Sequence, residues 1–190
     1  MKNVMLEDIE EIFFSQEQID EITSRIAEEI SNDYKDKNLT LICVLKGSVM
    51  FMSDLMKKIT IPCMIDFLAA ESYGSSTKSS GEVKITKDIS DDIRNRDVVI
   101  IEDILDSGRT LKKLTEFLNM KDPSSISICT LLDKPSRRAV DIEPRYVGSE
   151  VQDQFVVGYG LDYAQQYRNL PFIGILKKEA AERIANNNKV

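Results

Sequence analysis

Three long apolar runs constrain the fold of this chain more than any other feature of its sequence. They are "LTLICVL" at Leu39–Leu45, "VVII" at Val98–Ile101 and "SISICTLL" at Ser125–Leu132. Strands of a parallel sheet are buried on both faces, so they are apolar along their whole length instead of alternating with polar residues. The first two runs each lead through a loop into a helical pattern. The sequence therefore predicts the α/β fold class, with a mostly parallel central sheet flanked by helices.

The remaining patterns supply the helices and outer strands of this fold. Ser15 and Gln18 form a capping-box pair, and isoleucines spaced three or four residues apart follow them on one helix face. No internal repeat and no linker divides the chain, so we expect a single domain over residues 1–190. Further strands are predicted at 61–70, 82–86 and 170–176, and further helices at 49–58, 109–120 and 177–185.

Composition and charge exclude several classes of protein. The 190 residues are 42% hydrophobic, which is enough to bury one substantial core. A net charge of −7 and a pI near 4.8 argue against a chain whose main work is binding nucleic acid or an anionic membrane. No apolar run approaches the length of a membrane span, and the first residues lack the pattern of a secretory signal. We therefore expect a cytoplasmic protein that acts on small molecules.

Cysteine and histidine usage narrow the chemistry further. Cys43, Cys63 and Cys129 lie in separate apolar runs without CxxC spacing, which predicts core residues rather than a disulfide framework or a zinc site. The chain contains no histidine. Because histidine is the most common general base, acid–base chemistry here must use Asp, Glu, Lys or Tyr.

The stretch "VVIIEDILDSGRTL" combines an acidic pair with a loop suited to an anion. Glu102 and Asp103 follow a buried strand, and parallel sheets bind ligands at the carboxyl ends of their strands. An arbitrary acidic pair is about as often a solvated strand end. The loop Asp106–Thr110 then places hydroxyls and a glycine at a helix N-terminus, where free N–H groups attract phosphate. Acids beside a phosphate suit sugar hydroxyls or a magnesium ion, so the pattern indicates a phosphorylated sugar as ligand.

The same stretch resembles the 5-phosphoribosyl 1-pyrophosphate (PRPP) motif of the phosphoribosyltransferases, a set of apolar residues and two acids followed by Asp-Ser/Thr-Gly-Lys/Arg-Thr. The resemblance covers nearly all of the chain after about Ile9 and implies the type I phosphoribosyltransferase fold, with a small hood subdomain formed by the N-terminal and C-terminal segments. Other segments are similar, in the same order, to those of the hypoxanthine-guanine phosphoribosyltransferases: "VLKGSVMF", "ESYGSST", "LLDKPSRR", "FVVGYGLDY" and "YRNLPFIGIL".

The resemblance implies which residues bind the ribose phosphate. Glu102 and Asp103 are expected to contact the ribose hydroxyls and the metal. Asp106 is expected to act as general acid/base near N7 of the purine, a role that a carboxylate can fill in a chain without histidine. The 5′-phosphate is expected to contact the backbone N–H groups and hydroxyls of one loop, formed by Asp106, Ser107, Gly108, Arg109 and Thr110.

The pyrophosphate end of PRPP is assigned in the same way. Lys46 and Gly47 match a loop of the family in which the peptide bond before the lysine is often cis, and Arg168 matches an arginine that binds pyrophosphate. Asp162 matches a position that helps to hold magnesium and pyrophosphate near the purine. Without the resemblance, Lys46-Gly47 is typical of an ordinary strand-to-helix turn, and Asp162 and Arg168 are typical of surface charges.

The purine end completes the site that the resemblance implies. Lys134 is expected to bind the exocyclic O6 of the base, Phe155 to stack on the ring, and Val156 to offer backbone groups to its edge. On their own these residues are more typical of a solvated lysine and of strand core. Ser72 and Tyr73 match a flexible active-site loop at about 71–82, which is thought to close over the reacting centre.

The activity implied is transfer of the phosphoribosyl group of PRPP to N9 of hypoxanthine or guanine. The products are IMP or GMP and pyrophosphate, the cofactor is Mg²⁺, and the pathway is purine salvage. The family also suggests a homodimer or homotetramer, with no nucleic-acid or membrane partner. The alternative is a non-catalytic PRPP-sensing regulator on the same fold. The acidic pI, the lack of a helix-turn-helix segment and the presence of Asp106 favour the enzyme.

Overall fold

The computed structural model describes residues 4–72 and 83–187, and its centre is a six-stranded sheet. The strand order is β4-β3-β2-β5-β6-β7. Neighbouring strands from β3 to β7 in this order pair in parallel, and β4 pairs antiparallel with β3 at one edge. The prediction of a mostly parallel central sheet is therefore confirmed. The strands are β2 (Leu39–Leu45), β3 (Cys63–Ser72), β4 (Val83–Lys87), β5 (Asp97–Leu105), β6 (Ser125–Asp133) and β7 (Tyr146–Glu150).

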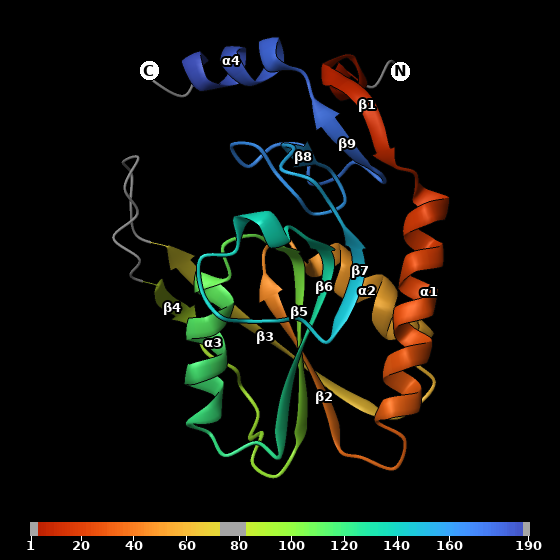
Figure 1. Cartoon of the computed structure of the whole chain (residues 1–190), viewed down its shortest axis with the longest axis vertical. Helices are drawn as coiled ribbons and strands as arrows, with labels where there is room; N and C mark the ends of the chain where they lie inside the picture. Colours follow the sequence, from red (N-terminus) through yellow and green to blue (C-terminus); the bar gives the residue numbers. More distant parts are fainter. Residues whose placement is uncertain (1–3, 73–82, 188–190) are drawn as a thin grey trace.

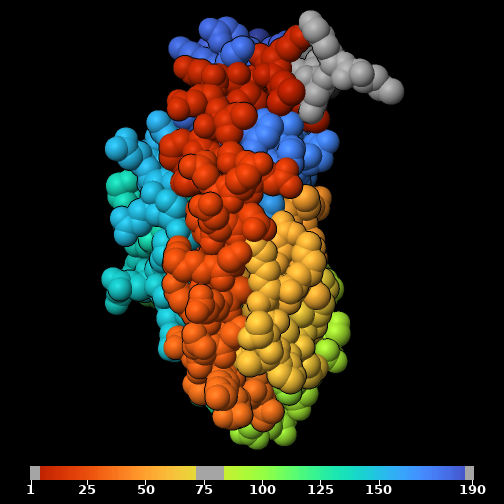
Figure 2. Space-filling model, turned by 90° about the vertical axis from the view of Figure 1, so that its right-hand side faces the viewer, coloured from red at the N-terminus to blue at the C-terminus, as the bar shows by residue number. Residues whose placement is uncertain are grey.

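Helices cover both faces of this sheet (Figure 1). α1 (Gln16–Asp33) and α2 (Val49–Lys58) pack on one face, and α3 (Arg109–Asn119) packs on the other. Figure 2 shows α1 and α2 side by side along the outside of the molecule. The predicted capping box begins α1: the Ser15 hydroxyl accepts the backbone N–H of Gln18, and the Gln18 side chain accepts the backbone N–H of Ser15.

Burial on two faces explains the apolar runs. In β2, Leu41 and Cys43 belong to the core cluster under α1 and α2, whereas Ile42 and Val44 belong to the cluster under α3. Successive side chains of a strand point to opposite faces, so a strand with helices on both sides needs apolar residues at every position. The cysteines are free thiols, as predicted; Cys43 and Cys129 are buried and Cys63 is partly buried.

A second, smaller sheet joins the two ends of the chain. It consists of β1 (Ile9–Phe14), β9 (Ile173–Leu176) and β8 (Val156–Val157), all antiparallel. The short 3₁₀ helix η1 (Val4–Asp8) precedes it and α4 (Lys178–Asn187) follows it. Figure 1 shows this sheet beyond the carboxyl ends of the central strands. The segment that runs through β8 lies against the loops that leave β2 and β6, because Gly160 packs on Gly47 and Lys134 donates to the Gln154 carbonyl.

Two strands escape sequence patterning. β1, "IEEIFF", is mostly exposed and carries two glutamates, so it lacks the apolar run of a buried strand. β7 is five residues long, contains Gly148 and lies at the edge of the central sheet. Within the described parts of the chain, no helix combines the length and the apolar composition needed to cross a membrane.

Candidate active site

A pocket of about 450 Å³ lies at the carboxyl end of the central sheet. It is lined by residues from the end of β5, from the loop after β6 and from the segment that runs through β8 toward β9. The fold thus brings together six residues that were predicted for the site from distant parts of the sequence. These are Asp103, Asp106, Lys134, Phe155, Val156 and Asp162.

The acidic pair at the end of β5 is held away from water. Asp103 is 8% exposed, and its Oδ1 accepts the backbone N–H of Ile104 at 2.7 Å. Burial raises the pKa of Asp103 to about 6. Burial, together with the neighbouring Asp103, also raises the pKa of Glu102 well above its usual value, and the buried Oε2 atom of Glu102 has no hydrogen-bond partner. Buried carboxylates of this kind are stabilised by hydroxyl donors or by a cation.

The loop after this pair presents backbone N–H groups. Gly108 is the N-cap of α3 at φ +77°, a left-handed conformation, and no side chain caps this end of the helix. Beside it lies a smaller pocket of about 120 Å³, lined by Glu102, Ser107 and Thr110 among others. A helix N-terminus with free N–H groups attracts an anion, so the pocket has the chemistry of a phosphate site. The exposed Arg109 side chain lines a different pocket, with Lys112.

The loop after β2 is packed against the acidic pair. The Leu45–Lys46 peptide bond is cis, and the Lys46 side chain is exposed. A Cβ atom on Gly47 would lie only 1.7 Å from Oδ2 of Asp103, and a Cβ atom on Gly160 would lie 1.9 Å from the carbonyl oxygen of Gly47. The contact at Gly160 requires glycine, because a side chain there would displace the backbone of the loop after β2; a side chain at Gly47 would displace the carboxylate of Asp103.

A pair of charges connects the segment after β8 to the same place. Arg168 forms an ion pair with Asp162 at 2.7 Å, and its Nη1 donates to the Gly160 carbonyl at 2.7 Å. The buried Nε atom of Arg168 has no hydrogen-bond partner. The Arg168 charge also opposes the rise in the pKa of Asp103 that burial causes. Arg168 therefore carries positive charge into the part of the site formed by Gly47 and Asp103.

The main pocket also combines a buried lysine with an exposed aromatic ring. Lys134 is 7% exposed, and its Nζ donates to the Gln154 carbonyl at 2.6 Å. Phe155 is 53% exposed, and its ring meets that of Tyr163 edge to face at 5.3 Å. Val156 is buried in β8. A planar ring with a polar edge could therefore rest on Phe155 and direct that edge toward Lys134 and the Val156 backbone.

Comparison with known proteins agrees with this geometry. Residues 13–164 match the family described as "Phosphoribosyl transferase domain". The chain belongs to the phosphoribosyltransferase family. A hypoxanthine-guanine phosphoribosyltransferase of Staphylococcus epidermidis is 51% identical over 175 residues, which are 92% of this chain and 98% of the relative. The family resemblance predicted from the sequence is confirmed.

Solved structures extend the likeness of this phosphoribosyltransferase to the whole fold. A crystal structure of a hypoxanthine phosphoribosyltransferase from Staphylococcus aureus is 50% identical and gives a TM-score of 0.91, covering 94% of this chain and 97% of its own. A hypoxanthine-guanine phosphoribosyltransferase from Bacillus anthracis is 43% identical with a TM-score of 0.84, covering 89% and 99%.

Sequence reasoning missed two charged residues of this phosphoribosyltransferase site. Arg137 Nε lies 3.3 Å from Asp106 Oδ1, and Arg137 Nη1 lies 3.2 Å from Asp153 Oδ2. The next residue, Arg138, donates to the Asp106 carbonyl at 2.6 Å and pairs with the buried Asp133. The signal was available in "DKPSRR", where two arginines follow Lys134 closely, but nothing in the pattern shows that they turn back toward β5.

Part of the predicted active-site loop cannot be placed. Ser72 is the last residue of β3, whereas Tyr73 and the rest of 73–82 lie outside the described residues. The roles expected for Ser72 and Tyr73 therefore stay predictions.

The acidic side chains of the site suit a metal ion that is shared with a bound ligand. Among the residues described, no three His, Cys, Asp or Glu side chains lie close enough to one another to form a metal site. Magnesium usually keeps several water ligands and binds through one or two carboxylates plus substrate phosphates. The carboxylates of Glu102 and Asp103 fit that mode, since the buried Oε2 atom of Glu102 has no hydrogen-bond partner among the residues that the structure describes. Asp162, the third predicted ligand, is paired with Arg168.

Proposed function

We propose that this chain transfers the 5-phosphoribosyl group of PRPP to N9 of hypoxanthine or guanine, forming IMP or GMP and releasing pyrophosphate. One observation carries the proposal: a single pocket joins Asp103 and Asp106 of the PRPP motif to Lys134 and Phe155. The relatives that are about half identical to this chain are named for the same transferase. The activity belongs to purine salvage.

The sugar-phosphate part of PRPP binds to residues at the end of β5 and in the loop that follows it. The ribose hydroxyls donate to Glu102 and Asp103, whose buried carboxylates need such donors. The 5′-phosphate binds in the smaller pocket, to N–H groups at the start of α3 and to the hydroxyls of Ser107 and Thr110. Pyrophosphate contacts the backbone at Lys46 and Gly47 and the guanidinium of Arg168, which supplies charge-assisted hydrogen bonds.

The purine half explains the chemistry and the choice of base. N9 bonds to C1′ of the ribose as the bond from C1′ to the pyrophosphate oxygen breaks, and Asp106 takes the proton that the purine loses at N7. Phe155 stacks on the ring. Lys134 donates from Nζ to O6, and adenine, with an amino group there, lacks that acceptor. The site therefore selects 6-oxopurines.

Mg²⁺ is the proposed cofactor. Glu102 and Asp103 would hold it jointly with the substrate, with Asp162 on the pyrophosphate side, and when bound the ion neutralises charge on the departing pyrophosphate. The ionised form of Asp103 is the one that binds a cation. Because the pKa of Asp103 is about 6, PRPP and metal binding should weaken as the pH falls below that value.

The alternative of a non-catalytic PRPP-sensing regulator has less support, because the named relatives are transferases. A single assay separates the two functions. The purified chain is supplied with PRPP and Mg²⁺ and, separately, with hypoxanthine, guanine, xanthine or adenine, and nucleotide and pyrophosphate are measured. The enzyme forms IMP and GMP and little AMP; PRPP binding without product from any 6-oxopurine favours the regulator.

Three further expectations remain proposals. They are a single domain over residues 1–190, assembly as a homodimer or homotetramer, and a cytoplasmic location. Mass measurement in solution tests the assembly.

A further inference from the structure

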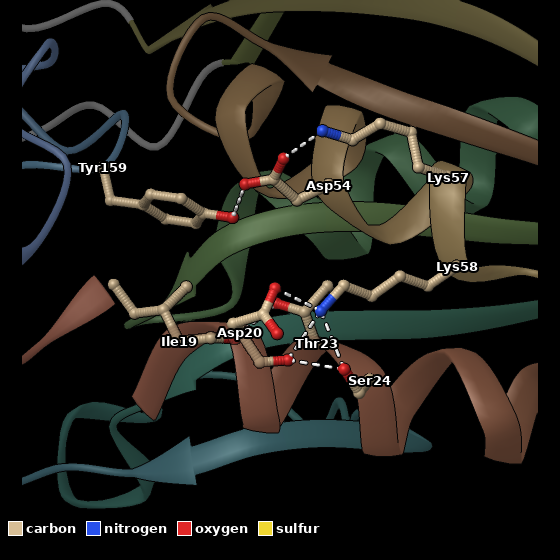
Figure 3. A network of polar contacts seen from close by, with 8 residues as sticks. All are labelled: Ile19, Asp20, Thr23, Ser24, Asp54, Lys57, Lys58 and Tyr159. Atoms are coloured by element: carbon tan, nitrogen blue, oxygen red, sulfur yellow. Dashed lines mark hydrogen bonds and ion pairs between the residues drawn. The ribbon is translucent and has the colours of Figure 1, made fainter. Parts of the chain in front are cut away.

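One partly buried hydrogen bond outside the pocket connects the two parts of the fold beside the proposed pyrophosphate site. The hydroxyl of Tyr159, which is 4% exposed, donates to Asp54 Oδ2 at 2.6 Å. Tyr159 belongs to the segment after β8, and Asp54 lies on α2. Figure 3 shows the Tyr159 side chain reaching from that segment to the helix, where Asp54 also pairs with Lys57.

The backbone around Tyr159 is unusual. Tyr159 has φ +49°, and the glycines on both sides of it have φ +98°. A tyrosine in the left-handed region is uncommon, because its Cβ atom is crowded by the backbone. Such a conformation persists where surrounding contacts hold it, and it is often found at functional sites. Here the backbone N–H groups of Tyr159 and Gly160 donate to the carbonyls of Leu170 and Arg168, each at 2.9 Å, and the buried ring adds its hydrogen bond to Asp54.

The residue after Tyr159 contacts the pyrophosphate loop directly. Gly160 packs so closely on Gly47 that a Cβ atom would lie 1.9 Å from the Gly47 carbonyl oxygen. Gly47 packs in turn on the carboxylate of Asp103. The segment after β8, the loop after β2 and the end of β5 are therefore stacked in that order, and the middle one carries Gly47.

Asp54, the other partner of the bond, lies on the helix that directly follows the same loop. α2 begins at Val49, directly after the loop, and Ser48 within the loop donates its hydroxyl to the Val44 carbonyl. At its far end α2 is attached to α1, because Lys58 donates to the Asp20 carbonyl at 2.8 Å (Figure 3). Asp54 thus lies on a helix whose position is set by the central sheet and by α1.

The pKa shifts of both partners favour a neutral phenol as donor and an ionised carboxylate as acceptor. Burial, and then the hydrogen bond to Asp54, raise the pKa of Tyr159, so the phenol stays a donor. Burial alone raises the pKa of Asp54, but hydrogen bonds from Lys57 and Tyr159 outweigh it and the pKa is lowered. An ionised acceptor makes the bond stronger than one between neutral groups.

We propose that Tyr159 and Asp54 are a positioning pair that holds Gly160 against Gly47 and so sets the affinity of the site for the pyrophosphate end of PRPP. The inference rests on the proposed function, in which the Lys46-Gly47 loop binds pyrophosphate. Neither Tyr159 nor Asp54 lines the pocket assigned to the purine. The pair should therefore act on PRPP and pyrophosphate and leave purine binding almost unchanged.

Steady-state kinetics and calorimetry of the full chain test the pair. Tyr159→Phe and Asp54→Ala should each raise the KM for PRPP, and the Kd for pyrophosphate measured with Mg²⁺, by about fivefold to tenfold, which lies within the usual effect of one hydrogen bond. The KM for hypoxanthine should change less than about twofold. The double variant should be no worse than either single variant, because both remove the same bond. Asp54→Asn keeps an acceptor oxygen and should retain most of the wild-type affinity.

Tyr146→Phe is the matched control. Tyr146 is also a buried tyrosine whose hydroxyl donates to an aspartate, Asp33, at 2.7 Å, but this bond joins β7 to the far end of α1. Its loss should lower the melting temperature by an amount similar to that of Tyr159→Phe without changing either KM.

Two outcomes would overturn the positioning pair. One is a PRPP KM for Tyr159→Phe and Asp54→Ala equal to that of the wild type. The other is an equal rise in the KM values of PRPP and hypoxanthine, which indicates general loosening of the fold. Failure of the proposed function looks different: the wild-type chain then forms no nucleotide and binds no pyrophosphate, which would remove the basis of the pair as well.

Discussion

At Asp103 the requirements of the proposed site conflict with the stability of the fold. Its carboxylate is buried, and its pKa is raised from 3.8 to about 6. The folded protein therefore holds the proton more tightly than the unfolded chain does, so ionisation costs stability. The cost is absent below the unfolded value and complete above about pH 6. In the proposed function, ribose hydroxyls and a metal ion would stabilise the ionised carboxylate of Asp103 when PRPP binds.

Asp103→Asn should therefore stabilise the ligand-free protein in a pH-dependent way. Asparagine keeps the oxygen that accepts the Ile104 N–H but carries no charge. We expect the free energy of unfolding to rise by about 3 kcal/mol at pH 8 and by only about 1 kcal/mol at pH 4.5. Urea unfolding at the two pH values measures both differences. An equal gain at both would show that the ionised carboxylate is not the cause.

Asp66→Asn is a control that should change the free energy of unfolding in the opposite direction. Asp66 is also buried, but it accepts the backbone N–H groups of Phe67, Ser90 and Asp91. Burial alone raises its pKa, and these bonds together outweigh burial and lower it. The ionised form therefore stabilises the fold above the unfolded value, near pH 4, and that stabilisation is lost as the pH falls further. Asp66→Asn should destabilise the protein, most strongly at pH 8.

Asp106 carries a prediction about the chemical step. Its carboxylate is half exposed at the pocket and pairs with Arg137. As the proposed acid/base at N7, it contributes most when the proton moves, so Asp106→Asn should slow single-turnover formation of IMP by about 100-fold or more. The Kd for PRPP should change by less than about fivefold. Asp153→Asn removes the other partner of Arg137 and should slow the step by less than about threefold, the range of an exposed ion pair.

At the scale of elements, the turn that begins α3 depends on one glycine. Gly108 has φ +77°, and a Cβ atom there would lie 2.5 Å from the Ile142 side chain. Gly108→Ala meets both the strained backbone and the contact, so it should lower the free energy of unfolding by about 1 to 2 kcal/mol. It should also raise the KM for PRPP, because the N–H groups proposed to bind the 5′-phosphate move with the turn. Thermal unfolding and initial rates measure these effects; an unchanged KM would separate the turn from phosphate binding.

Elements were predictable where burial dictates composition. β2, β5 and β6 were found from the sequence because both of their faces are covered, and α1 because its capping box and apolar face are local signals. β1 and β7 were not, because edge strands that bury little apolar surface leave no such pattern. β1 and β7 are strands because they pair with β9 and β6, not because their own residues form an apolar run.

In the candidate site, too, local patterns could be predicted from the sequence and contacts between distant segments could not. Glu102 to Thr110 could be predicted because the acids, the loop and the helix start are consecutive. The contacts of Arg137 with Asp106, of Gly160 with Gly47 and of Tyr159 with Asp54 could not. They join residues 31 to 113 positions apart in the chain, and no local pattern encodes how those segments meet. The residues proposed to bind the purine, Lys134 and Phe155, are predicted through family resemblance alone.

At the scale of the whole molecule, the side chain of Asp8 adds hydrogen bonds to the pairing of β1 with β9 that joins the two ends of the chain. Asp8, at the end of η1, accepts two hydrogen bonds of 2.7 Å from Arg183 of α4 and one of 2.8 Å from Tyr167. Burial alone raises the pKa of Asp8, but the bonds from Arg183 and Tyr167 outweigh it and the pKa is lowered. These contacts of Asp8 stabilise the second sheet. That sheet carries β8 and hence Val156, which lines the main pocket.

Asp33 makes an equivalent set of contacts in the larger part of the molecule. It accepts the Tyr146 hydroxyl at 2.7 Å and the Arg145 guanidinium at 2.7 Å, and its pKa is lowered mainly by the Tyr146 hydroxyl. The two aspartates therefore offer a matched comparison: the same three residue types, one set closing the second sheet and one set closing α1 onto β7.

Asp8→Ala should loosen the second sheet and spare the central one. We expect faster amide hydrogen exchange in β1 and β9 with little change in β2 and β5, a loss of about 1 to 2 kcal/mol in local stability, and a raised KM for hypoxanthine. Asp33→Ala should give the reverse exchange pattern and leave that KM unchanged. Since both carboxylates have lowered pKa values, their contributions are present above about pH 4 and disappear below it, so the two variants should converge on the wild type in acid. Faster exchange in β2 and β5 after Asp8→Ala would mean that the two sheets unfold as one unit, and that the second sheet cannot loosen around the purine by itself.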